Sequence, residues 1–184
     1  GYDAAGRRGR REYPAHTAAA PDVLLLGWDA ADRLTSQVKQ EGATQRTVAQ
    51  YSWMGDRLLR RWNGTVETLA GWDALGRPSS IEHRLASGTP VARFDLRHDA
   101  GTHVTGVLRT FYDAAGAPLP DSAAGGLAGG LSNDFDAANR MVATRGGIPA
   151  ANWLAGSVAG ALLQTLLDYD RNENRVAVSE NSGG

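Results

Sequence analysis

The sequence Trp72-Asp73-Ala74-Leu75-Gly76-Arg77 contains the pattern that decides the fold. It reads as an aromatic residue, Asp, two intervening residues, a turn residue and Arg. Asp is favoured at the first position of a type I β-turn and Gly at the fourth. A type I turn followed by a left-handed residue is a common three-residue loop of β-hairpins. The pattern therefore predicts a hairpin in which the aromatic residue ends one strand and the Arg opens the next.

The same pattern occurs several times along the 184 residues, which indicates an internal repeat. Asp32 or Asn139 replaces Gly in two copies, and both residue types tolerate the left-handed conformation at modest cost. The full copies besides the first are Tyr2-Asp3-Ala4-Ala5-Gly6-Arg7, Trp28-Asp29-Ala30-Ala31-Asp32-Arg33 and Phe135-Asp136-Ala137-Ala138-Asn139-Arg140.

Four further stretches match the pattern only in part. Two keep the aromatic residue and the Asp, and two are shortened or shifted. They are Tyr112-Asp113-Ala114-Ala115-Gly116, with Ala117 in the place of Arg, Tyr169-Asp170 followed by Arg175, Trp53-Met54-Gly55-Asp56-Arg57, and His98-Asp99-Ala100-Gly101. We therefore divide the whole chain, 1–184, into about eight units that start near residues 2, 28, 53, 72, 98, 112, 135 and 169.

The composition agrees with a chain built from turns and strands. It has 23 Gly, no Cys, and a formal net charge of −1. The balanced charge argues against a general nucleic-acid-binding surface, and the absence of Cys excludes a disulfide framework. Segments such as 91–97 alternate apolar and polar residues, as half-buried strands do. We expect an all-β fold, and open sheet edges that need flanking strands for stability.

The tandem units resemble the Rhs/YD-repeat family, whose signature is repeated Tyr-Asp-x-x-Gly-Arg. Asn63-Gly64-Thr65 ahead of the unit at Trp72 resembles the turn that often precedes such a unit. The resemblance implies tandem β-hairpins joined edge to edge in one continuous, spiralling antiparallel sheet. It also implies a segment of a shell, in a large secreted or surface protein of bacteria, that encloses or presents a C-terminal toxin or effector domain. Flanking YD repeats and that effector would be the partners, in the same full-length chain.

The stretch 147–167 interrupts the repeat and is open to several interpretations. Two strands joined by a glycine turn are the leading one, because the next unit must return to the sheet. A helical insertion is the alternative, since 155–167 is rich in helix-forming residues. A membrane span is not expected, because the 18-residue run from Ala150 to Leu167 contains Asn, Ser, Gln and Thr and falls short of about 20 mainly apolar residues.

Metal sites and catalytic sites are not predicted. The run from Asp168 to Ser179 lacks the Gly and Glu of a calcium loop, and His98 and His103 are remote in sequence from His16 and His83. No Cys nucleophile and no Gly-x-Ser-x-Gly motif is present. We therefore expect a structural segment without cofactor, metal or enzymatic activity.

The six aromatic residues that begin units carry the main hypothesis and its alternative. If the segment is structural, their rings pack between neighbouring hairpins while Asp and Arg fix the turns. If it is a carbohydrate- or cell-wall-binding module, the ring faces stay open for stacking on sugars. The residues are Tyr2, Trp28, Trp72, Tyr112, Phe135 and Tyr169.

Overall fold

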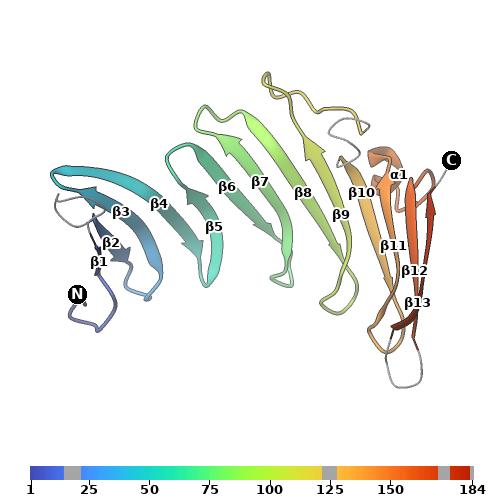
Figure 1. Cartoon of the computed structure of the whole chain (residues 1–184), viewed down its shortest axis with the longest axis horizontal. Coiled ribbons are helices and arrows are strands. Elements are labelled where there is room, and N and C mark those ends of the chain that lie inside the picture. The colour runs from blue at the N-terminus through green and yellow to red at the C-terminus, as the bar shows by residue number, and fades with distance from the viewer. Residues whose placement is uncertain (15–21, 122–127, 170–174, 183–184) are drawn as a thin grey trace. The chain divides into compact units, whose positions relative to one another are not determined.

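The structure is a computed structural model that describes residues 1–14, 22–121, 128–169 and 175–182. Each strand pairs with the strand that follows it in the sequence, all antiparallel where the register is recorded, and the strand order is that of the chain (Figure 1). The all-β prediction is thus confirmed. The elements are β1 (Arg10–Tyr13), β2 (Asp22–Trp28), β3 (Leu34–Glu41), β4 (Thr44–Met54), β5 (Arg57–Trp62), β6 (Val66–Trp72), β7 (Pro78–Leu85), β8 (Pro90–His98), β9 (Val104–Phe111), β10 (Gly129–Phe135), β11 (Met141–Ile148), α1 (Ala150–Leu154), β12 (Leu163–Tyr169) and β13 (Arg175–Ser182).

Short turns explain why the strands meet in chain order. Glu41 pairs with Thr44 around a two-residue loop, in which Gly42 has a φ of 60°. A positive φ at the first loop position matches the turn types that suit the twist of a hairpin. At the other end of β3, the turn motif 29–33 connects it to β2. Antiparallel neighbours joined by such turns need no crossover helix.

The chain divides into two compact units, which we describe separately. The first comprises residues 1–70 and 83–88, and the second comprises 71–82 and 89–184. In the first unit, Gly1 and Tyr2 form a short outer segment that hydrogen-bonds to the segment 8–10. In the second unit, β8 to β12 pair in sequence, with register shifts that mark bulges in β10 and at the end of β8.

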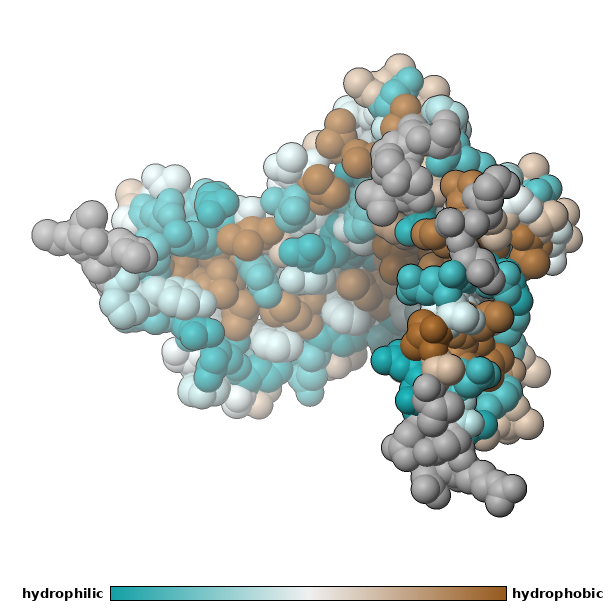
Figure 2. All heavy atoms as spheres, turned by 45° about the vertical axis from the view of Figure 1, so that its right-hand side comes forward, coloured by the Kyte–Doolittle hydropathy of each residue, from teal (hydrophilic) through white to brown (hydrophobic). Residues whose placement is uncertain are grey.

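Few side chains are fully buried, so the strands are not held by a thick core. Nine apolar residues are buried among the described part of the chain, and four of them are alanines: Ala49, Ala92, Ala128 and Ala143. Hydrophobic and hydrophilic residues are interspersed on the face that Figure 2 shows. A hairpin without a core must gain its stability from its neighbours, because an isolated two-stranded hairpin is marginally stable at best.

The densest packing lies in the second unit, around Trp153 of α1. Leu108, Ile148 and Trp153 form a buried cluster. The leading prediction of two strands is therefore wrong for 150–154, which is helical. The alternative of a helix over 155–167 is also wrong, because the helix ends before that stretch and the strand β12 begins at Leu163. Within the described residues, no helix is long and apolar enough to cross a bilayer.

Candidate functional site: the hairpin turns and the contacts between them

The Asp of each turn motif organises the turn around it. In the first copy, Oδ1 of Asp3 accepts hydrogen bonds from the backbone N–H of Ala5 at 3.0 Å and of Arg7 at 2.9 Å. The N–H of Gly6 donates to the carbonyl of Asp3, and the N–H of Asp3 donates to the carbonyl of Arg7. These bonds close a tight hairpin loop from residue 3 to residue 7.

Four other copies repeat this arrangement. Asp29, Asp73, Asp113 and Asp136 accept the same pair of backbone hydrogen bonds at 2.8–3.0 Å. The left-handed residue predicted at the fourth position is present in all five copies, with φ values of 60–82° at Gly6, Asp32, Gly76, Gly116 and Asn139. The repeated sequence pattern therefore produces the same backbone conformation in all five turns.

An ion pair reinforces the turn in the copies that have Arg. The Nε of the Arg lies 2.8 Å from Oδ2 of the Asp four residues earlier, in the pairs Asp3–Arg7, Asp29–Arg33, Asp73–Arg77 and Asp136–Arg140. The backbone N–H of the Arg, followed by its guanidinium, lowers the pKa of Asp3, Asp73 and Asp136. For Asp29 the guanidinium of Arg33 is the larger cause of the lowered pKa.

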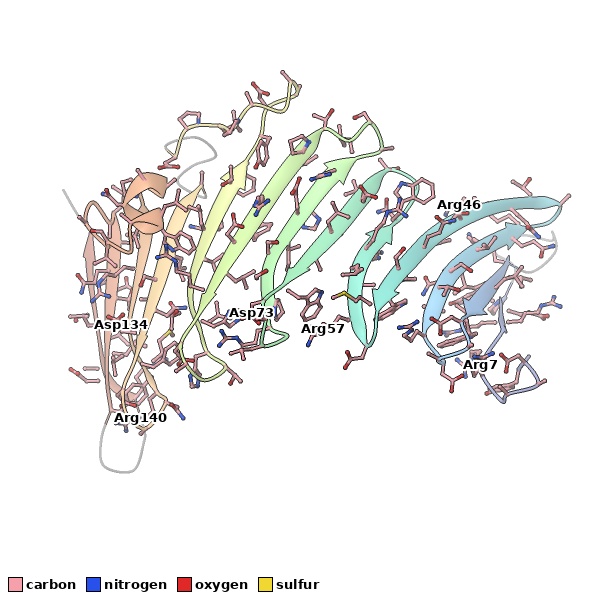
Figure 3. All side chains as sticks on the ribbon, turned by 180° about the vertical axis from the view of Figure 1, so that it is seen from behind. Arg7, Arg46, Arg57, Asp73, Asp134 and Arg140 are labelled. Atoms are coloured by element: carbon pink, nitrogen blue, oxygen red, sulfur yellow. The ribbon has the colours of Figure 1, made fainter. Side chains whose placement is uncertain are left out.

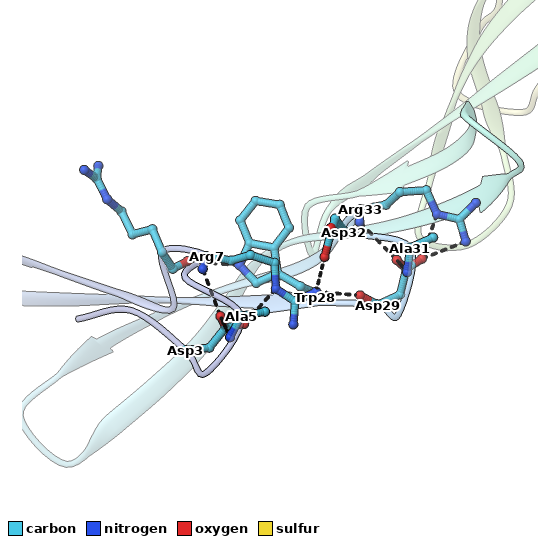
Figure 4. A network of polar contacts seen from close by, with 9 residues as sticks. Asp3, Ala5, Arg7, Trp28, Asp29, Ala31, Asp32 and Arg33 are labelled. Atoms are coloured by element: carbon cyan, nitrogen blue, oxygen red, sulfur yellow. Dashed lines mark hydrogen bonds and ion pairs between the residues drawn. The ribbon is translucent and has the colours of Figure 1, made fainter.

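The same Arg also reaches the next hairpin. In the first unit, Nη1 of Arg7 donates to the carbonyl of Asp29 and to Oδ1 of Asp32, both at 2.8 Å (Figure 4). Arg33 repeats the contact by donating from Nη1 to the carbonyl of Gly55. One guanidinium therefore pairs with its own Asp and also binds the backbone of the following turn.

The second unit has the same contact. Nη1 of Arg77 donates to the carbonyls of Asp99 and Gly101, each at 2.7 Å. Further along, the guanidinium of Arg140 lies 4.9 Å from the centre of the Tyr169 ring, within the range of a cation–π interaction. Figure 3 shows Arg7 of the first unit, and Asp73 and Arg140 of the second, at hairpin turns.

The aromatic residue of a later copy returns a hydrogen bond to the hairpin before it. The indole N–H of Trp28 donates to the carbonyl of Arg8 at 2.9 Å, and that of Trp53 donates to the carbonyl of Leu34 at 2.8 Å. The hydroxyl of Tyr169 donates to the carbonyl of Met141 at 2.9 Å. Each acceptor is the residue directly after a motif Arg. We call each of these contacts, from the Arg forward or from the aromatic residue back, an inter-hairpin contact.

Among the described residues, the copy at Tyr112 takes no part in an inter-hairpin contact of this kind. It follows β9, whereas the other turns of the second unit, 73–77, 99–103 and 136–140, lie at the opposite ends of the strands. Its Asp113 still organises the turn, and a Cβ on Gly116 would lie 3.2 Å from Pro90. Ala117, in the place of Arg, thus belongs to a turn at the opposite ends of the strands. If this copy is not counted, there is one turn motif for each pair of strands.

The irregular copy at His98 has a histidine in the place of the motif Arg, which the sequence pattern did not reveal. His103 stands four residues after Asp99, as Arg does elsewhere, and its Nδ1 lies 2.7 Å from Oδ2 of Asp99. This hydrogen bond is the main cause of the lowered pKa of Asp99. The imidazole also stacks on Phe135 of the next copy, with 4.8 Å between ring centres. The spacing from Asp to His was the signal that could have revealed it.

Other predicted residues are placed as follows. The short copy at Trp53 has a two-residue loop, with Met54 paired to Arg57 and a φ of 60° at Gly55. Trp72 ends β6, and Arg175 begins β13 opposite Tyr169. His16 and residues 170–174 of the run considered as a calcium loop, Asp170 among them, lie outside the described residues. In the part of the chain that is described, no three His, Cys, Asp or Glu residues are grouped to hold a metal.

Trp153 was not singled out by the sequence pattern. Its indole N–H donates to the carbonyl of Leu131 at 3.0 Å, and the guanidinium of Arg97 lies 3.8 Å from its ring centre. A Cβ added to Gly130 would lie 2.4 Å from Cδ1 of Trp153, and one on Gly106 would lie 3.1 Å from Nε1. Glycine within a strand often marks such a close approach.

A cleft of about 480 Å³ lies beside Trp153, over β8 to β10. Several of its polar lining residues already have protein partners. Asp99 bonds to His103, Asp134 forms an ion pair with Arg145 at 2.6 Å, and the amide of Asn133 donates to the carbonyl of Val104. These three polar side chains of the cleft therefore serve the fold, because their polar groups already bind other parts of the chain.

Comparison with known proteins reveals a likeness of fold only. No protein-family model matches the chain, and no curated protein matches it. Among solved structures, it is similar to a Tc holotoxin pore of Photorhabdus luminescens and to TcdB2-TccC3 complexes, one of which contains Cdc42. In each case the identity is 13%, the TM-score is 0.67, and the match covers 88% of this chain and 8% of the other. The chain thus has the fold of a small part of these toxin proteins.

Proposed function

We propose that this chain is a structural segment of an Rhs/YD-repeat protein. It forms part of a shell wall that encloses or presents a toxin or effector domain located elsewhere in the same protein. The observation that carries the proposal is the repeated inter-hairpin contact, which joins consecutive hairpins in chain order. The similarity in fold to a small part of the Tc toxin chains supports it. We further propose that the full protein is secreted or displayed on the cell surface, and that this segment has no catalytic role.

The distribution of buried side chains supports a wall rather than a globular domain. Only one cluster of buried residues occurs in the part of the chain that is described, and much of the remaining burial is alanine. Repeat proteins of this kind are stabilised by the interfaces between neighbouring units. The turn motifs supply such interfaces, because Arg7, Arg33 and Arg77 each bind both their own turn and the next.

The aromatic side chains favour packing over sugar binding. The ring of Tyr169 lies against Arg140, and that of Phe135 stacks on His103. The indole groups of Trp28 and Trp53 donate to backbone carbonyls of the preceding hairpin. A sugar platform needs an open ring face, whereas these rings already have protein neighbours.

Limited proteolysis of the full-length protein tests the proposal. We expect the domain that follows the repeats to resist a protease that rapidly cuts the same domain in isolation. The double variant Arg77→Gln/Arg140→Gln, which weakens two inter-hairpin contacts, should make that domain accessible. Arg46→Gln is the matched control, because Arg46 is exposed and forms no ion pair with the described residues. Equal cleavage of the domain within the native protein and in isolation would contradict an enclosing shell.

A further inference from the structure

The turn between β5 and β6 is built around the side chain of Asn63. The carboxamide oxygen Oδ1 accepts hydrogen bonds from the backbone N–H of Thr65 at 3.0 Å and of Val66 at 2.8 Å. The backbone N–H of Asn63 donates to the carbonyl of Val66 at 3.2 Å. We call residues 63–66 the Asn63 turn. A single side-chain oxygen thus accepts two of the hydrogen bonds that close this hairpin.

The same hydrogen bonds hold the carboxamide beside the peptide unit of Gly64. An Asn oxygen that is bonded to the N–H two residues later encloses the intervening peptide in a ring. Gly64 has a φ of 92° and no side chain to obstruct an approach to its nitrogen. Among the described residues, neither the N–H of Gly64 nor Nδ2 of Asn63 donates a hydrogen bond. Residues 63–65 are exposed, so water reaches both groups.

This arrangement has the parts of an intramolecular acyl transfer. When hydroxide or another base from solvent removes its proton, the nitrogen of Gly64 can attack Cγ of Asn63 and form a new C–N bond. Negative charge then develops on Oδ1, which already accepts the N–H groups of Thr65 and Val66, as an oxyanion does in an oxyanion hole. The bond from Cγ to Nδ2 breaks, and Nδ2 takes a proton from water and leaves as ammonia. A cyclic imide remains in the backbone.

We propose that the Asn63 turn is a site of spontaneous deamidation. Water then opens the imide at one of its two carbonyl carbons. Cleavage of the bond between Cγ and the nitrogen gives Asp at position 63, and cleavage at the original backbone carbonyl gives isoaspartate. Both products add one negative charge to the turn, and the reaction needs only base and water from solvent.

The two products affect the hairpin differently. In the Asp product, the carboxylate can accept the same two hydrogen bonds from Thr65 and Val66, so the turn is kept. In isoaspartate the chain runs through Cγ, which adds one carbon to the backbone of the turn and makes Oδ1 a peptide oxygen. The pairing of β5 with β6 should therefore weaken as the protein ages. This consequence does not depend on the proposed function.

Three other asparagines show what protects an Asn side chain from this reaction. Nδ2 of Asn133 and of Asn152 donates to a backbone carbonyl, at 3.3 and 2.9 Å. The N–H of Arg140, which follows Asn139, donates to a turn carboxylate at 3.0 Å. None of the three is followed by Gly. The leaving group or the attacking nitrogen is thus already bound in each of them, unlike at Asn63.

Mass spectrometry of the full-length protein, kept in mildly alkaline buffer with water labelled by heavy oxygen, tests the site. We expect Asn63 to lose its amide about tenfold faster in the folded protein than in a peptide of residues 58–69, the factor that one hydrogen bond to a charged group supplies. The product should carry one labelled oxygen and include both Asp and isoaspartate, because direct hydrolysis without the imide gives Asp alone.

Asp134→Gly is the matched control variant, because it places Gly after Asn133 in the extended strand β10, where Nδ2 of Asn133 is bound. Asn133 in this variant should lose its amide at least about tenfold more slowly than Asn63. A rate at Asn63 equal to or below that of the peptide, or Asp as the only product, would overturn the proposal.

Hydrogen exchange measures the effect on the hairpin. Aged protein enriched in isoaspartate should exchange the amides of β5 and β6 about fivefold faster than fresh protein, as expected from the loss of one hydrogen bond. Asn63→Asp adds the same charge without rerouting the backbone, and should change this exchange by less than about twofold. Equal exchange in aged and fresh protein would show that deamidation does not weaken the hairpin and would overturn that part of the inference.

Discussion

Removing the hydroxyl of Tyr169 should weaken one inter-hairpin contact without disturbing anything else. Tyr169→Phe deletes the hydrogen bond to the carbonyl of Met141 and keeps the ring against Arg140. A net hydrogen bond contributes about 1 kcal/mol to stability. The retained cation–π contact is worth about 0.5–1 kcal/mol at a partly exposed site. We therefore expect a loss of about 1 kcal/mol for Tyr169→Phe and of about 2 kcal/mol for Tyr169→Leu, which removes both interactions.

Native-state hydrogen exchange is the suitable assay, because a repeat array opens locally and need not unfold as one unit. A loss of about 1 kcal/mol corresponds to roughly fivefold faster exchange in β11 and β12. Tyr51→Phe is the matched control, since the hydroxyl of Tyr51 has no hydrogen-bond partner among the described residues. If both variants change exchange by less than about twofold, the hydroxyl does not hold the hairpins together and our interpretation of the contact is wrong.

Three further predictions follow from the turns and from Trp153. Gly130→Ala should destabilise the chain by about 1–3 kcal/mol in thermal unfolding, because its Cβ would overlap Trp153, whereas Gly146→Ala, with no atom within 4 Å, should cost far less. His103→Arg should raise the melting temperature by about 2 °C, because a guanidinium can pair with Asp99 and also bind the next turn, as Arg7 does with Asp3 and Asp29; a lowered melting temperature would argue that position 103 does not take the place of the motif Arg. The turn Asp carboxyls have lowered pKa values in the folded chain, so their stabilisation is present above the ordinary Asp pKa and is lost as the pH falls through the lowered value. Asp29→Asn should accordingly make the free energy of unfolding depend less on pH in the acid range, as measured in an unfolding titration. An unchanged pH dependence would contradict the stabilising role of this carboxylate.

The hairpin fold was predictable because its determinants are local. Asp at one position and Gly, Asn or Asp three residues later specify a loop, and a residue such as Asn139 could be assigned a left-handed conformation from its place in the motif alone. The partner of Asp3 within its own turn was equally accessible, since it lies four residues away. What the pattern did not contain was the second role of Arg7, whose Nη1 binds a turn about 25 residues further along.

The parts that sequence reasoning missed depend on contacts between distant segments. Nothing near Tyr112 indicates that its turn lies at the opposite ends of the strands; that follows only from counting strands in the structure. The helix around Trp153 is fixed by Leu131 and by glycines in strands far from it in sequence. His103 was concealed because the pattern was defined with Arg, although imidazole fulfils the same role of pairing with the carboxylate.

Electron cryomicroscopy of the full-length protein tests the central claim most directly. The account predicts that the strands described here continue into a longer sheet, and that this sheet forms the wall of a chamber around another domain. A map in which residues 1–184 form a separate domain, with no chamber, would contradict it.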